Sequence, residues 1–220
     1  MCRMLLAASP GKIDPNPHLD ALREIAKTSK EYQGHGWGCA WLDHASRWRL
    51  YHNILPIWED AASFDSTTCF IAHARSAFRD EGIAVENNMP FTDGEKVFAF
   101  NGELRGVRIK ADGRIGAEKI FNTIRRFDKG PALREAVERG VMVINRRTRH
   151  IRAMNFILAG RLGIHVCSQF SEDPDYFQLR EGVWGDTRIV CSEPYDRPDI
   201  SWKRLKNHRI FSYRLDGGLS

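Results

Sequence analysis

The second residue of the chain is a cysteine, in the opening sequence Met1-Cys2-Arg3. When the initiator methionine is removed, Cys2 carries a thiol and the free α-amine on one residue. An α-amine has an ordinary pKa of about 7.7–8.0, so part of it is unprotonated near neutral pH and can accept the thiol proton. Such a residue supplies both nucleophile and general base, an established arrangement in covalent catalysis. The small side chain at position 2 favours methionine removal. Cys2 is therefore a candidate catalytic nucleophile, although a cysteine at this position also occurs by chance.

A nucleophile that attacks an amide carbonyl needs hydrogen-bond donors for the negative charge that develops on the carbonyl oxygen. Asn101-Gly102 follows an apolar run that is typical of a buried strand. An Asn side-chain amide and a Gly backbone N–H can together form such an oxyanion hole, although Asn-Gly by itself is also a common turn dipeptide. We therefore take Asn101 and Gly102 as candidate catalytic residues.

Two further segments carry residue types suited to substrate binding. His73-Ala74-Arg75 ends a second buried strand. The planar fork of an Arg can hold a carboxylate through two hydrogen bonds, and a structural ion pair is the alternative. Residues 34–41 (GHGWGCAW) let the backbone approach a ligand or another strand closely, although a tight turn before a strand also explains them. The candidate substrate-binding residues are Arg75, Trp37, Gly38 and His73.

The apolar pattern predicts the elements that must position these residues. Strands are expected at 2–8, 38–42, 47–53, 68–74, 95–101, 151–159, 162–168, 176–180 and 187–191. Helices are expected at 18–31, 116–128 and 131–140. Strands followed by two central helices and then by further strands are typical of a two-sheet α+β structure in one domain.

Composition restricts the classes of partner. The chain has 220 residues, a net charge of +5 and a sequence pI of about 9.0, which suits acidic small molecules. There is no long Lys/Arg block and no basic stripe interleaved with aromatic residues, so we expect no nucleic-acid partner. The first apolar run ends at Pro10-Gly11 and is too short to span a bilayer, so we expect no membrane association.

Cysteine usage indicates the compartment. Five cysteines occur without a CxxC spacing, which argues against a disulfide framework or a zinc site. We expect a soluble cytoplasmic protein with no metal and no cofactor. An alternative function is that of a metal hydrolase whose ligands would be His35, Cys39, Cys69 and His73. The spacing of these four residues does not match a known ligand pattern, so we do not favour it.

Several segments occur in the order found in class II glutamine amidotransferases, which are N-terminal-nucleophile hydrolases. They are MCR at 1–3, GWGCAW at 36–41, HARSA at 73–77, NMPF at 88–91, FNGEL at 100–104, MNFIL at 154–158 and IVCSEPY at 189–195. Residues 1–220 thus resemble one domain of this family. The chain resembles in particular stand-alone γ-glutamyl amidases, such as that of the ergothioneine pathway and the amidase subunit of the cytosolic glutathione-degradation complex. The resemblance implies an α+β fold, the four-layer αββα sandwich of that superfamily.

The resemblance also implies a role for each motif residue. Cys2 would be the nucleophile and, through its α-amine, its own general base. The Asn-Gly pair at 101–102 would form the oxyanion hole, and Arg75 would bind the α-carboxylate of a glutamyl substrate. Trp37 and Gly38 would shape the wall near the nucleophile.

The chain departs from the family pattern at four positions. The family usually has His where Met89 and Phe100 stand, and Thr or Ser where Phe78 stands. It usually has an acidic residue where Gly116 stands, and that acid holds the substrate's α-ammonium group. A buried ammonium without a counter-charge binds poorly. Its loss implies either a substitute acid, such as Asp112 or Glu103, an inefficient enzyme, or a substrate without a free α-amine.

The leading interpretation is an enzyme that hydrolyses a γ-glutamyl, glutamine-type amide of a small molecule through a thioester on Cys2. It would act alone or donate ammonia to a separate synthase or peptidase partner chain, and self-association stays open. The alternative is a degenerate, non-catalytic binding or regulatory member of the same fold. The lost polar groups favour this alternative, whereas the retention of Cys2, Arg75 and Asn101 opposes it.

Overall fold

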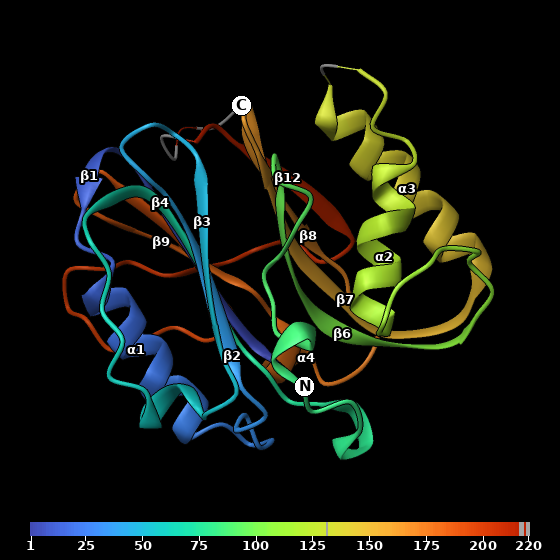
Figure 1. Ribbon diagram of the computed structural model, residues 1–220, viewed down its shortest axis with the longest axis horizontal. Coiled ribbons are helices and arrows are strands. Elements are labelled where there is room, and N and C mark those ends of the chain that lie inside the picture. The colour runs from blue at the N-terminus through green and yellow to red at the C-terminus, as the bar shows by residue number, and fades with distance from the viewer. Residues whose placement is uncertain (131, 216–217, 219–220) are drawn as a thin grey trace.

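Two antiparallel β-sheets pack face to face, and helices cover their outer faces (Figure 1). The computed structural model describes residues 1–130, 132–215 and 218. In these residues the first sheet has the strand order β11-β9-β10-β1-β4-β2-β3, and the second has the order β12-β8-β7-β6-β5. Every strand pair in both sheets is antiparallel.

The first sheet contains the N-terminal strand and is built from both ends of the chain. Its strands are β1 (Arg3–Ile13), β2 (Trp37–Leu42), β3 (Trp48–Asn53), β4 (Thr67–Ala74), β9 (Arg180–Trp184), β10 (Thr187–Cys191) and β11 (Lys203–Arg204). The second sheet is formed by β5 (Phe91–Thr92), β6 (Val97–Val107), β7 (Thr148–Gly160), β8 (Gly163–Ser168) and β12 (Arg209–Tyr213).

Helices complete the outer layers. The helix α1 (Asn16–Lys27) packs on the first sheet, and α2 (Gly116–Arg125) and α3 (Leu133–Arg147) pack on the second (Figure 1). The predicted α+β fold, a four-layer αββα sandwich, is therefore confirmed. No helix in the described part of the chain has the length and apolar character needed to cross a membrane.

Alternation along the strands divides the hydrophobic residues between the layers. Met4 and Leu6 of β1 belong to the core between the sheets, together with Ile71 of β4 and Ile157 of β7. Leu5, between the first two, lies in the cluster beneath α1. Both faces of the central strands are thus buried, which explains why the sequence at 2–8 is apolar without a break.

The structure differs from the sequence prediction near the C-terminal strands. The strand expected at 176–180 is wrong, because Pro174–Phe177 form the short helix α4 and β9 begins only at Arg180. Asp173 has a left-handed backbone (φ +46°), and a proline then opens the helix, where its fixed φ is favourable. The helix predicted at 131–140 is α3, which continues to Arg147; residue 131 lies outside the described residues. The strands β5, β11 and β12 were not predicted.

We expect Ile157→Ala to lower the free energy of unfolding by about 2–5 kcal/mol, because it opens a cavity in the core between the sheets. Leu162→Ala is the matched control, since Leu162 is 76% exposed in the turn between β7 and β8, and it should change stability by less than about 0.5 kcal/mol. Urea unfolding measures both. Equal effects of the two substitutions would show that the space between the sheets is not a packed core.

Candidate active site

Cys2 lies immediately before β1, at the edge of the first sheet where β4 ends. Arg3 pairs with Ala74, the last residue of β4. Because the two strands are antiparallel, Cys2, which precedes Arg3, lies beside Arg75, which follows Ala74. The Ser76 N–H donates to Cys2 Sγ at 3.4 Å, and Ser76 O lies 3.5 Å from the same sulfur atom. By the alternation of β1, Cys2 shares the face of Met4 and points between the two sheets. The side chain is only 8% exposed.

Burial determines the protonation state of this thiol. Desolvation raises the pKa of Cys2, and the N-terminal ammonium, the Ser76 N–H and the Arg75 guanidinium offset that effect only in part. The thiol is therefore protonated near neutral pH. Because the thiolate is the reactive species, nucleophilic attack by Cys2 requires a base that accepts its proton.

Polar groups surround the bond between Met1 and Cys2. The Met1 ammonium pairs with Glu31, and the Met1 carbonyl oxygen accepts hydrogen bonds from Gln33 Nε2 (2.6 Å) and Tyr176 Oη (2.5 Å). Gln33 Oε1 is buried and has no partner among the described residues. Because the Met1 carbonyl carbon is bonded to the Cys2 nitrogen, removal of Met1 would leave the new α-amine beside Gln33 and Tyr176.

The second sheet supplies the candidate oxyanion hole. Asn101 lies in β6, fully buried, and neither its Oδ1 nor its Nδ2 has a partner in the described part of the chain. It shares the face of Val97 and Ala99, which belong to the core between the sheets. A Cβ at Gly102 would lie 2.1 Å from the Ala153 carbonyl oxygen, so only glycine fits at this position. Asn101 thus faces the space into which Cys2 points, with its amide unpaired.

His73 connects the two sheets at this level. Its Nε2 donates to the Phe100 carbonyl oxygen at 3.0 Å, immediately before Asn101 in β6. Burial lowers the pKa of His73 to about 3, so the ring is neutral and its proton is on Nε2, since a carbonyl can only accept. This hydrogen bond fixes how far β6, which carries Asn101, is displaced along the direction of β4 in the facing sheet. The geometry favours a positioning role for His73 over direct substrate contact.

Arg75 is a buried cation without a counter-ion. It is 4% exposed, and its Nη2 donates to the Gly82 carbonyl oxygen at 2.9 Å, whereas Nη1 has no partner and no carboxylate of the described residues pairs with it. Desolvation lowers its pKa, but a guanidinium stays charged in proteins. Arg75 also lowers the pKa of Cys2, so the two groups are neighbours. An anionic group of a ligand would satisfy this guanidinium.

The two residues expected to form the wall have different surroundings. A Cβ at Gly38 would lie 2.6 Å from the Met89 carbonyl oxygen, so glycine is needed for this close approach on the side of the sheet that His73 shares. Trp37 points to the opposite side, where it packs on Tyr51 and donates through Nε1 to Asp60 at 3.0 Å. Its side chain supports the sheet beneath α1 and does not line the space between the sheets.

The departures from the family pattern also have definite positions. Met89 and Phe100 are buried in the cluster beneath α2 and α3, behind the second sheet. Phe78 is 58% exposed, and Gly116 is the first residue of α2, where a Cβ would meet nothing within 4 Å. Two of the four changes therefore belong to hydrophobic packing.

Sequence reasoning missed several residues of this region. Ser76, Gln33 and Tyr176 contact Cys2 or its preceding peptide from three separate segments. Ser76 lies within the HARSA motif and Gln33 directly precedes residues 34–41, but neither was singled out for a role. The metal-site alternative finds no geometric support, since Cys39 and Cys69 lie in different hydrophobic clusters on opposite faces of the first sheet.

No protein-family model matches the chain, and no curated protein matches it in sequence. Solved structures do match. Glutamine phosphoribosylpyrophosphate amidotransferase from B. subtilis, complexed with ADP and GMP, has a TM-score of 0.68 and 15% identity, covering 98% of this chain and 48% of that chain. A glutamine aminotransferase class-II domain protein from Silicibacter pomeroyi has a TM-score of 0.66 and 15% identity over 98% and 96% of the two chains.

A predicted glutamine amidotransferase from Pseudomonas aeruginosa PA01 is also similar, with a TM-score of 0.62 and 15% identity over 99% of each chain. The fold is that of class II glutamine amidotransferase domains. The chain spans about half the length of the B. subtilis enzyme and nearly the full length of the other two proteins. At this identity the comparison concerns the fold, and the chemistry has to be argued from the site.

We expect alkylation of Cys2 by iodoacetamide to be slow near pH 7 in the Met1-bearing chain and to accelerate only as the pH rises past 9.0, the ordinary thiol pKa. The reason is that burial raises this pKa, so the thiolate is scarce below it. Peptide mapping by mass spectrometry measures the rate at each cysteine, with Cys2→Ala as control. A half-maximal rate near pH 7 would contradict the burial argument.

Proposed function

We propose that this chain is a class II glutamine amidotransferase-like hydrolase that cleaves a γ-glutamyl, glutamine-type amide through a thioester on Cys2. The single observation that carries the proposal is that the buried Cys2 thiol lies in one region with two groups that keep unpaired atoms, the Asn101 amide (Oδ1 and Nδ2) and the Arg75 guanidinium (Nη1). Buried polar groups without partners are costly to a folded chain, so a cluster of them indicates a ligand site. The similar folds support the same assignment.

The reaction follows from these groups. After Met1 is removed, the Cys2 α-amine accepts the thiol proton, and the thiolate attacks the amide carbonyl carbon. Asn101 Nδ2 and the Gly102 N–H donate to the oxyanion of the tetrahedral intermediate. The C–N bond then breaks, the α-ammonium protonates the leaving amine, and the acyl group stays on Cys2 as a thioester. Water, deprotonated by the same amine, attacks the thioester and releases the acid and the thiol.

Several finer statements belong to this proposal. We place residues 1–220 in one domain that acts on a small γ-glutamyl compound, as a stand-alone amidase or as the ammonia donor of a separate partner chain. A cytoplasmic location is part of the proposal, and the five free cysteines support it. The competing function is a non-catalytic binding protein, for which the exposed Phe78 and the missing acid at Gly116 are the specific observations.

Intact mass after incubation with 6-diazo-5-oxo-norleucine or its N-acetyl derivative tests the proposal. We expect a protein that lacks Met1 and gains one adduct from at least one of the two electrophiles, because each presents a glutamine-like carbonyl to the thiolate. Cys2→Ala is the control and should gain none. A processed protein that neither reagent labels would support the binding-protein alternative, and retention of Met1 would remove the amine base.

Asn101→Ala should lower kcat for amide hydrolysis by about 10²–10³-fold with little change in KM, because it removes one donor to the oxyanion. Its melting temperature should not fall, since the Asn101 amide has no partner in the described residues. Asn122→Ala is the matched control, since the Asn122 side chain bonds the Asp112 carbonyl at the surface of α2. A rise in KM with kcat unchanged would show that Asn101 acts in substrate binding and not on the oxyanion.

A further inference from the structure

Arg75 and Asn87 donate hydrogen bonds to the same backbone carbonyl oxygen, that of Gly82. Arg75 Nη2 and Asn87 Nδ2 each donate to Gly82 O at 2.9 Å, so the two side chains converge on one atom. Each also keeps one unsatisfied polar atom, Nη1 on Arg75 and Oδ1 on Asn87. Both side chains are at least nine-tenths buried. One unpaired donor atom of a cation, Arg75 Nη1, and one unpaired acceptor atom of a neutral group, Asn87 Oδ1, therefore belong to two side chains that meet at Gly82 O.

Three carboxylates that could balance a second cation here pair with other cations, and one of them, Glu31, pairs with Arg152 as well as with the Met1 ammonium. Glu118, in the first turn of α2, accepts from both the backbone N–H and the guanidinium of Arg114. Glu103 is bound by Arg105 and Arg152.

The acids that flank Gly82 and Asn87 in the chain, Glu81 and Glu86, lie at the surface. Asp80 is 81% exposed and lies 3.5 Å from His35, and Asp112 is exposed. The acceptor at this subsite is thus an uncharged carboxamide, among the residues that the structure describes.

This arrangement matches a specific pair of ligand groups. A carboxylate satisfies the Arg75 guanidinium, and an adjacent N–H donor satisfies Asn87 Oδ1. An ammonium group would bring a second positive charge into a buried site that already holds the Arg75 cation and offers no counter-charge. An amide N–H has no charge to desolvate, so the acylated α-nitrogen fits the subsite better than the free α-ammonium does.

We propose that the substrate is a γ-glutamyl amide whose α-nitrogen is acylated, with its α-carboxylate on Arg75 and its α-amide N–H on Asn87. The proposal rests on the proposed function, because it names the substrate class of the same site. Asn87 is then a specificity-determining residue.

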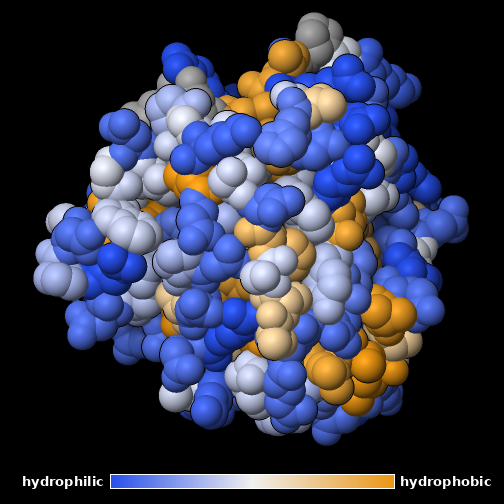
Figure 2. All heavy atoms as spheres, turned by 60° about the vertical axis from the view of Figure 1, so that its left-hand side comes forward, coloured by the Kyte–Doolittle hydropathy of each residue, from blue (hydrophilic) through white to orange (hydrophobic). Residues whose placement is uncertain are grey.

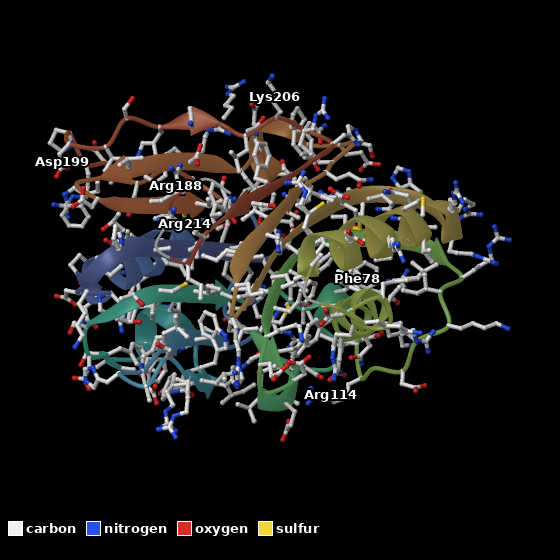
Figure 3. The ribbon with its side chains drawn as sticks, turned by 90° about the horizontal axis from the view of Figure 1, so that it is seen from above. Phe78, Arg114, Arg188, Asp199, Lys206 and Arg214 are labelled. Carbon is white, nitrogen blue, oxygen red and sulfur yellow. The ribbon has the colours of Figure 1, made fainter. Side chains whose placement is uncertain are left out.

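The chain segment that joins the two residues offers a place for the acyl group. Phe78, Ile83 and Val85 are 58%, 45% and 37% exposed on this segment. Gly82 has a left-handed backbone (φ +61°), and a Cβ at this position would lie 3.9 Å from Ile115, just before α2. Figure 3 accordingly shows Phe78 and Arg114 on the side of α2, away from Asp199. On the face drawn in Figure 2, hydrophobic residues gather at the lower right, and hydrophilic residues cover most of the rest.

Binding to the Cys2→Ala protein tests the inference without requiring catalysis. Isothermal titration calorimetry would compare N-acetylglutamine, glutamine and glutaramate, which share the carboxamide and the carboxylate and differ only at the α-position. We expect N-acetylglutamine to bind about tenfold or more tightly than either of the others, since hydrogen bonds to charged or buried partners carry about this energy. Equal or weaker binding of N-acetylglutamine, or no binding of all three, would overturn the proposal.

Two substitutions that add a carboxylate sharpen the test. Asn87→Asp and Gly116→Asp should each shift the preference toward free glutamine by about tenfold, because either carboxylate can pair with the α-ammonium. A Cβ at Gly116 meets nothing within 4 Å, so this variant should fold. Gly11→Asp is the matched control, since Gly11 is equally open on β1, and it should leave the preference unchanged. An unchanged preference in both site variants would overturn the role of this subsite.

The placement of the acyl group is tested with a ligand that carries a longer acyl chain. N-hexanoylglutamine should bind more tightly than N-acetylglutamine, and Phe78→Ala should abolish that gain. No gain from the longer chain would overturn the placement of the acyl group on this segment. Failure of the proposed function is seen separately, as a processed protein that neither diazo reagent labels, whereas these binding constants do not depend on a reactive Cys2.

Discussion

The pairing of β1 on both sides is the constraint on which the site depends. β1 hydrogen-bonds to β10 on one side and to β4 on the other, in the middle of the first sheet. An N-terminal residue is ordinarily poorly ordered unless a strand holds it. Here the backbone ladder ends at Arg3, so the preceding Cys2 has little freedom, and the sulfur is held beside Ser76. The same ladder continues through β4 to Arg75, which brings a cation to the nucleophile.

Asn101 and Gly102, the other part of the site, come from the second sheet. The hydrogen bond from His73 to the Phe100 carbonyl oxygen joins this part to the sheet that carries Cys2. The sheets also contact each other through apolar side chains and, away from Cys2, through Arg188 of β10 over the Tyr213 ring of β12. The bond from His73 to the Phe100 carbonyl is directional, and because burial lowers the pKa of His73 the ring keeps its neutral, donating form. The unpaired Asn101 amide therefore lies at a defined level opposite Cys2. In a dry site, such donors interact strongly with developing charge, because water does not compete.

The unsatisfied groups also determine what the site can accept. Arg75 offers one charge, Asn87 offers none, and the acids nearby are already paired or exposed. In our proposal, this charge balance selects among glutamyl compounds by the state of their α-nitrogen. The absence of an acid at Gly116 argues for a degenerate binding protein in the competing function, whereas in our proposal it changes the specificity of a hydrolase.

The sequence alone was sufficient to predict the layered α+β fold, because local apolar runs and ordered motifs carry that information. It also named the main candidates, Cys2, Asn101-Gly102 and Arg75, whose catalytic and binding roles stay predictions. It misassigned residues 176–180, where a left-handed Asp173 and a proline override a strand-like pattern. It also left Trp37 and His73 as substrate contacts, because a motif does not show which face of a strand a side chain occupies. The partners Ser76, Gln33, Tyr176 and Asn87 required the tertiary structure, since they meet across long sequence separations where only packing and register bring polar groups together.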